Sequence, residues 1–223
     1  TADWQWHDHG NETDHPVVWM DGLDIPLVRS LNTMFFQMYT ERQVPATKPV
    51  NASKELYGYG RLSPTWVKER PQSSPLLLYS WDQTLEALRA LRDHEGSPYE
   101  GIALEYTHPQ TGGPCLPTIG CHVQLIRPGE HLQARRTTGS VVFCVVQGEG
   151  YSVINGEQFV WSKGDVIALP SWALCEHANT ASEDAVLFSI RDRPVLETLG
   201  FYREEVLVEN GGHQEVVGVF SPE

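Results

Sequence analysis

An internal repeat limits this chain to folds that contain two related domains. The eight residues 4–11, Trp-Gln-Trp-His-Asp-His-Gly-Asn, return in altered form at residues 172–179 as Trp-Ala-Leu-Cys-Glu-His-Ala-Asn. The offset is 172 − 4 = 168, and it also pairs later residues: Val18 with Val186, Asp24 with Asp192, Pro26 with Pro194 and Leu31 with Leu199. A period of this length is too long for a solenoid and has the size of a domain.

The sequences before the two copies are very unequal. A long run of strand-like sequence begins near Gly120 and leads up to the second copy, whereas three residues precede the first. We therefore expect the chain to begin inside the last part of its first domain, with the earlier part of that domain missing.

Residues 101–190 have the pattern of an all-β domain. Short β-rich runs are separated by turns rich in Pro and Gly, at residues 101–106, 121–126, 141–146, 151–154, 157–161, 165–169 and 185–190. Several short strands at this spacing, without helices between them, predict a sandwich or a barrel.

The rest of the chain is predicted to hold a few helices around such domains. Residues 1–30 are interpreted as a terminal strand and a turn, with an apolar run at 16–20, and apolar spacing predicts a helix from Leu27 to about Arg42. A Pro-rich wrapping linker and a helix that starts near Ser80 follow. The resulting division is into residues 1–42, 43–95, 96–192 and 193–223, the last being a helix and a tail run, 215–220, that could add an edge strand to a neighbouring domain or subunit.

The charge balance argues against two classes of partner. Sixteen Lys and Arg residues face 29 Asp and Glu residues, giving a formal net charge of −13, which opposes approach to a nucleic acid or an anionic membrane. No apolar run reaches the roughly 20 residues needed to cross a bilayer. The four cysteines show no C-x-x-C spacing, so we expect free thiols and a cytoplasmic location.

The turns of the second domain resemble those of the cupin fold, at residues 127–130, 147–150, 163–165 and 170–172. In cupins a first motif supplies H-x-H and a carboxylate, and a second motif supplies one more His, to a metal ion inside the barrel. Here Arg135 and Thr137 stand at the H-x-H positions, and Cys175 stands at the position of the last His. Arg has no lone pair to donate and Thr is a poor ligand, so we expect this barrel to be metal-free and structural.

The first copy keeps the histidine that the second has lost. His7 corresponds to Cys175 at the offset of 168, and its retention favours a metal ligand over an ordinary histidine bonded to a neighbour. His9 corresponds to His177, which lies in the metal-free copy, so His9 is interpreted as a group beside the site or against the substrate. Asp21 corresponds to Ser189 and is a candidate for chemistry, although an exposed turn aspartate is equally consistent with the sequence.

Three stretches closely resemble the gentisate 1,2-dioxygenase family of bicupins, which includes salicylate and 1-hydroxy-2-naphthoate dioxygenases. These are residues 4–11, residues 16–27 and residues 192–205. The resemblance implies an all-β bicupin, its first barrel incomplete in this chain. It also implies an Fe(II) site held by three His, of which His7 is present, with His9 beside the bound aromatic acid.

Several further expectations follow from the resemblance. Asp21 would orient the substrate, the chain would cleave gentisate with O2 in an extradiol-type reaction that gives maleylpyruvate, and four copies would form a homotetramer. Salicylate or 1-hydroxy-2-naphthoate remain alternative substrates. An alternative of another class is a metal-free bicupin that binds a small ligand or serves in assembly, because one expected ligand is present in the 223 residues.

Overall fold

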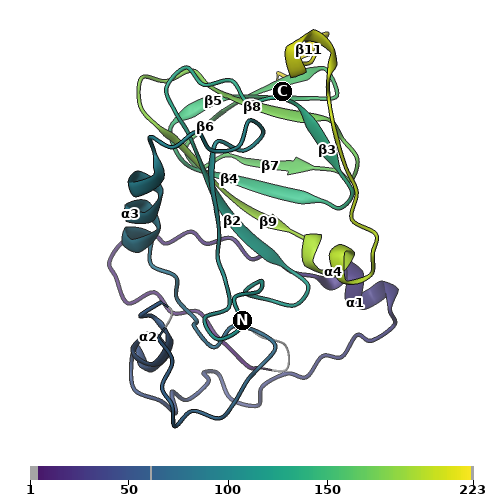
Figure 1. The fold of residues 1–223 in the computed structure, drawn as a ribbon. Coiled ribbons are helices and arrows are strands. Elements are labelled where there is room, and N and C mark those ends of the chain that lie inside the picture. The colour runs from purple at the N-terminus through teal and green to yellow at the C-terminus, as the bar shows by residue number, and fades with distance from the viewer. Residues whose placement is uncertain (1–4, 61, 222–223) are drawn as a thin grey trace.

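Two β-sheets packed face to face form the body of the protein, here called the barrel (Figure 1). The computed structural model describes residues 5–60 and 62–221. The first sheet has the strand order β1-β2-β9-β4-β7 and the second β10-β3-β8-β5-β6-β11. The strands are β1 Ile102–Glu105, β2 Gly120–Ile126, β3 Arg135–Thr137, β4 Val141–Gln147, β5 Glu149–Ile154, β6 Glu157–Ser162, β7 Val166–Leu169, β8 Cys175–Asn179, β9 Ala185–Arg191, β10 Glu204–Val206 and β11 Gly218–Val219. The sandwich predicted for residues 101–190 is confirmed.

Alternating apolar residues explain how the sheets close on each other. In β4, Val141, Phe143 and Val145 are buried while the residues between them are half-buried, as a period of two requires. They pack with residues from β2, β6 and β9, among them Trp161, which is 2% exposed. The indole Nε1 of Trp161 donates to Ser152 Oγ at 2.9 Å, so its polar atom is satisfied inside the apolar core.

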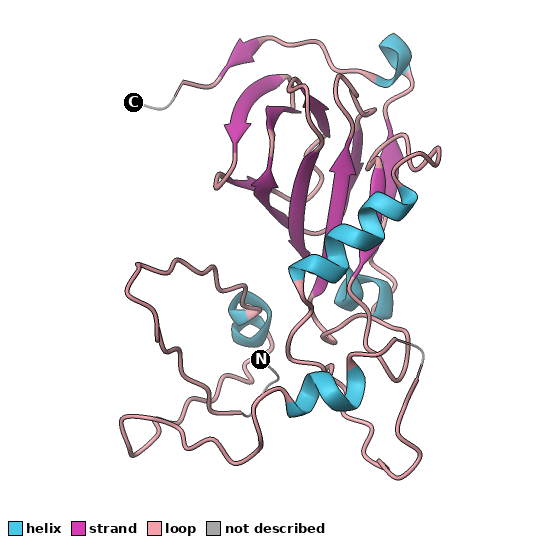
Figure 2. Cartoon of the chain, turned by 90° about the vertical axis from the view of Figure 1, so that its left-hand side faces the viewer, coloured by secondary structure: helices cyan, strands magenta, loops and turns pink. Residues whose placement is uncertain are grey.

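The described residues also form four α-helices and one 3₁₀ turn. They are α1 Ile25–Ser30, α2 Ala52–Tyr57, α3 Trp81–Leu91, α4 Arg193–Thr198 and the 3₁₀ turn η1 Glu209–Gly212. Of these, α1 and α2 lie beyond one end of the barrel (Figure 1). The predicted helix near Ser80 is confirmed as α3, which lies along the outer side of the barrel (Figure 2). Its Leu88 is fully buried against Ile102, Val123 and Leu125. No helix in the described ranges is long and apolar enough to span a membrane.

The internal repeat is visible in the helices. Adding 168 to the bounds of α1 gives the bounds of α4, and each helix follows an aspartate, Asp24 or Asp192, with a proline in its first turn. The two octapeptide copies differ, however. Residues 175–179 form β8 between β3 and β5, whereas residues 5–11 have no regular structure, and Trp4 lies outside the described residues. A strand needs a neighbour for its N–H and C=O groups, and residues 5–11 have no ladder partner within the described chain.

Two expectations for the N-terminal part were wrong. Residues 16–20 do not form a strand, because no described strand pairs with them. The helix expected from Leu27 to about Arg42 ends at Ser30, since Asn32 adopts a left-handed conformation (φ 53°) that stops it. Phe36 is 81% exposed, and no residue in 5–60 or 62–72 is buried.

The C-terminal tail crosses the outside of the second sheet. It pairs within the chain, where Gly218 and Val219 lie parallel to the first residues of β6. Three other strands of the described chain, β3, β8 and β10, were not predicted as strands, because charged and polar residues predominate in them. The domain limits at residues 42, 95 and 192 stay a prediction.

Candidate functional site

The three residues predicted to carry the chemistry lie on the irregular segment before α1. The imidazole rings of His7 and His9 approach with their centroids 5.5 Å apart, edge to face. His9 also stacks on Trp19, at 4.9 Å between centroids and 21° between planes. Asp21 follows two residues after Trp19 on the same segment. The structure therefore brings His7 and His9 together, and the side chains of His7, His9 and Asp21 are all exposed.

These residues alone do not fit a ferrous site. His7 belongs to no group of three potential ligand atoms within the part of the chain that is described. Iron sites of this kind need three protein donors that face one ion, with further positions left open. The ligand role of His7, and the substrate-side roles of His9 and Asp21, thus stay predictions about a larger assembly of residues.

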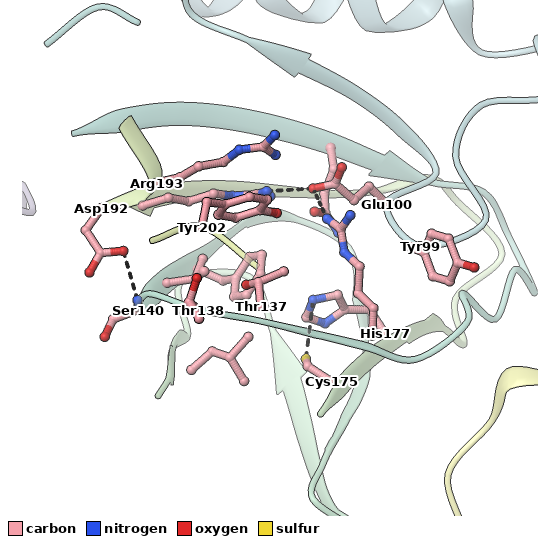
Figure 3. A pocket seen from close by; sticks show the side chains of 16 residues that line it. Tyr99, Glu100, Thr137, Thr138, Ser140, Cys175, His177, Asp192, Arg193 and Tyr202 are labelled. Atoms are coloured by element: carbon pink, nitrogen blue, oxygen red, sulfur yellow. Dashed lines mark hydrogen bonds and ion pairs between the residues drawn. The ribbon is translucent and has the colours of Figure 1, made fainter. Parts of the chain in front are cut away.

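The interior of the barrel holds a charged cluster in place of metal ligands (Figure 3). Arg135, the first residue of β3, and Arg191, the last of β9, each place a guanidinium nitrogen 2.7 Å from Glu100 Oε1. Burial alone would raise the pKa of Glu100, but Arg191 and Arg135 outweigh it and bring the pKa to about 2. The carboxylate is therefore ionised at neutral pH and neutralises part of the charge of the two guanidinium groups.

The pair of residues at the bottom of this cluster is uncharged. Burial raises the pKa of Cys175 to about 12, so its thiol stays protonated. Burial, with Arg191 nearby, lowers the pKa of His177 to about 4. His177 Nδ1 lies 2.7 Å from Ser152 Oγ, and its Nε2 is 3.8 Å from Cys175 Sγ. A neutral thiol beside a neutral imidazole is neither an activated nucleophile nor a thiolate ligand.

The space left in this interior is small. The cavity measures about 50 Å³ and is lined by Glu100, Gln124, Arg135, His177 and Arg191, among others. A pocket that accepts benzene measures about 150 Å³, so an aromatic acid does not fit here. The interior therefore offers no room for the aromatic acid, and that this barrel is metal-free and structural stays a prediction.

Two members of this interior cluster were not found in the sequence. Glu100 is separated by 35 residues from Arg135 and by 91 from Arg191, and nothing in its local sequence marks it. Arg191 could have been noticed in the sequence, because it is a charged residue directly at the end of an apolar strand. Arg135 and Cys175 were placed by the sequence at the positions of cupin metal ligands, and the structure pairs these two residues across β3 and β8.

Comparison with known proteins places these features in context. The family model described as "Cupin domain" matches residues 122–191. The chain is 42% identical to 5-aminosalicylate 1,2-dioxygenase of a Comamonas species over 96% of its length and 57% of the relative. It is 39% identical to gentisate 1,2 dioxygenase 1 of Aquipseudomonas alcaligenes, covering 92% of the chain and 58% of the relative.

The chain is also similar to a solved structure of such a dioxygenase. A variant of salicylate 1,2-dioxygenase from Pseudoaminobacter salicylatoxidans, in complex with gentisate, superposes with a TM-score of 0.80 at 32% identity. The superposition covers 89% of this chain and 56% of that chain. The chain thus spans somewhat more than half the length of each of these three proteins.

Proposed function

Because the chain belongs to the cupin family of gentisate and salicylate 1,2-dioxygenases, we propose that the whole protein is a ring-cleaving dioxygenase. Its substrate would be gentisate, cleaved with O2 to maleylpyruvate, and its metal Fe(II). The observation that carries the proposal is the identity of 39–42% to two such enzymes over more than nine tenths of the chain.

The differences between the two copies of the repeat suggest that the two barrels have different roles. Glu100, Arg135 and Arg191 fill the interior of the described barrel with fixed charges, so catalysis is assigned to the other barrel, to which His7 belongs. Ferrous iron would supply the activation of O2, and His7 is the one described residue assigned to it. The remaining ligands are to be sought among residues outside those described.

His9 and Asp21 are assigned to the aromatic acid. Stacking on Trp19 holds the imidazole plane of His9 and leaves its ring nitrogens at the edge, where one can donate a hydrogen bond to a carboxylate or hydroxyl oxygen. Asp21 would accept the proton of a ring hydroxyl. With a net charge of −13 on the chain, attraction of the anionic substrate must come from such local donors and the cation.

Assembly and location are also part of the proposal. The described residues before α3 expose several large apolar side chains, among them Val18 at 95%, Phe36 at 81% and Trp66 at 74%. Exposed apolar surface of this kind is typical of interfaces. We assign it to contacts with the rest of the protein and with other copies in a cytoplasmic homotetramer.

The test measures iron and turnover in the whole protein. His7→Ala should lose one iron per chain and abolish gentisate consumption, because a directly coordinating imidazole is removed. His15→Ala, a change of an exposed histidine on the same segment, is the matched control and should retain both. Iron retained at the wild-type amount by His7→Ala would overturn the ligand assignment. A wild-type protein with neither iron nor turnover would favour the metal-free binding module.

One observation supports 5-aminosalicylate as a second candidate substrate, beside gentisate. The identity to 5-aminosalicylate 1,2-dioxygenase, 42%, slightly exceeds that to the gentisate enzyme, 39%. The two acids differ in the group para to the ring hydroxyl, amino in one and hydroxyl in the other. Comparison of kcat/KM for gentisate, 5-aminosalicylate, salicylate and 1-hydroxy-2-naphthoate decides between them, and we expect gentisate to give the highest value.

A further inference from the structure

A buried carboxylate lies under the C-terminal tail, on the face of β8 that points away from the barrel interior. Cys175 and His177 face the interior, so Glu176 between them faces outward, as alternation along a strand requires. It is nevertheless 1% exposed, because the tail covers it. The tail is held there by Ala134 N–H donating to Gly212 O at 2.7 Å, and by Gln214 Nε2 donating to Val153 O at 2.8 Å.

Two histidines from distant parts of the chain meet this carboxylate. His131, from the loop before β3, places Nε2 3.2 Å from Glu176 Oε1. His213, from the tail, places Nδ1 3.6 Å from Glu176 Oε2. One nitrogen from each imidazole and a carboxylate oxygen all lie within 4.8 Å of one another. Ligand atoms about 2.1 Å from a tetrahedral zinc ion are separated by roughly 3.4 Å, so the separations of 3.2 and 3.6 Å suit a shared cation.

One atom of the group lacks a hydrogen bond. His213 Nδ1 is buried and has no hydrogen-bond partner in the described chain, since the carboxylate oxygen at 3.6 Å is beyond hydrogen-bonding range. An unpaired buried polar atom is costly, and this one faces Glu176. The carboxylate of Glu176 accepts the Gln214 N–H at 3.2 Å, and among the described residues it pairs with the two imidazoles and with no Lys or Arg. A cation between the two satisfies both groups at once.

We propose that His131, Glu176 and His213 form a binding site for a divalent transition-metal cation, with Zn2+ as the probe. Two imidazoles and one carboxylate are a donor set that zinc accepts with a position left open. The side chains of His131 and His213 are 35% and 32% exposed, so a water molecule can reach that open position. The site lies on the outer face of β8, apart from the interior cluster of Glu100, and uses none of the residues assigned to catalysis.

The cation would fasten the tail to the barrel. The three ligands come from the loop before β3, from β8 and from the segment after η1. These segments are far apart in the sequence and meet only in the folded chain. Binding to the folded state alone stabilises it and ties His213 to Glu176. The metal therefore acts on the position of residues 213–217, and its effect is measurable without any enzymatic turnover.

The test is equilibrium dialysis of the whole protein against Zn2+, with zinc and iron counted separately. Wild type should bind one zinc that His213→Ala binds at least about tenfold more weakly, because a direct ligand is lost. His94→Ala, at an exposed histidine outside the cluster, should bind like wild type. Equal zinc affinity in wild type and His213→Ala, or no zinc bound by wild type, would overturn the proposal.

A second readout separates a ligand role from a structural one. Zinc should slow proteolytic cleavage within residues 207–217 of wild type and have no such effect on His213→Ala or His131→Ala. Both histidines are partly exposed, so these variants are expected to fold. Protection by zinc that survives in both variants would contradict the site. These results do not depend on the iron content of His7→Ala, so failure of either proposal is recognised separately.

Discussion

Replacement of Glu100 by glutamine should destabilise the barrel by a calculable amount. The carboxylate has a pKa of about 2 in the folded protein and 4.5 as an unperturbed group, a gap of about 2.5. At 1.36 kcal/mol for each tenfold step, ionised Glu100 contributes about 3 kcal/mol at pH 7. The side chain is 19% exposed, so solvent screening removes little of this. The same loss can be described from the other side, because Glu100→Gln leaves Arg135 and Arg191 without their shared counter-charge, and breaking a buried ion pair costs about 3–5 kcal/mol.

The pH dependence identifies the cause. Because the folded pKa is depressed, the stabilisation is complete above pH 4.5 and is lost as the pH falls toward 2. The wild-type advantage over Glu100→Gln should therefore be about 3 kcal/mol at pH 7 and about 2 kcal/mol at pH 3.5. Urea unfolding at both pH values measures it, and Glu95→Gln, at an exposed glutamate, is the control. A difference below about 1 kcal/mol at pH 7, or one that does not shrink in acid, would refute the reasoning.

Two further changes test the barrel, one through its packing and the other through the titration of a buried histidine. A Cβ at Gly150 would overlap the carbonyl oxygen of Ala178 and lie 2.6 Å from the ring of Trp161, so Gly150→Ala should lower the free energy of unfolding by about 1–3 kcal/mol. A Cβ at Gly10 would meet nothing within 4 Å, so Gly10→Ala should leave the free energy of unfolding unchanged. Equal thermal midpoints for the two variants would contradict this account of the packing. The buried imidazole of His177 has its pKa lowered to about 4, so the unfolded chain binds a proton below pH 6.5 that the folded chain rejects. Stability should then fall by up to about 1.4 kcal/mol per pH unit from pH 6.5 toward 4, and His177→Gln should have a shallower slope in urea unfolding, whereas an unchanged slope would show that another group titrates.

Local patterns in the sequence were sufficient for most of the barrel. In β4 the alternation of Val141, Phe143 and Val145 shows both that the segment is a strand and which face is buried. The helix α4 was predicted, and the repeat relates it to α1 residue for residue. The pattern that indicates the β4 strand lies within a few neighbouring residues, which is where periodicity is reliable.

Predictions failed where the deciding partners are distant. One failure has a local cause instead, because the spacing of Met34, Phe35 and Met38 is helical, yet the left-handed conformation of Asn32 ends α1 before them. In β8 Glu176 is buried by a tail 37 residues further on, which its own neighbours do not indicate. The ion pair of Glu100 likewise cannot be recognised in the sequence, because its partner Arg191 lies beside it only in the folded chain. Such groups are joined by topology, so their chemistry is absent from any short window of sequence.

The two-residue strand β11 has a practical consequence for handling the protein. Val217 N–H and Phe220 N–H donate to Gly156 O and Gln158 O, and the ring of Phe220 stacks on Phe159, so the last residues complete the outer strand of the second sheet. Without them β6 would present unpaired backbone groups to solvent, which is how sheets recruit one another into aggregates. Because β11 pairs with β6 through two residues only, a purification tag attached directly after this segment could disturb the pairing. A flexible spacer before the tag would leave the pairing intact.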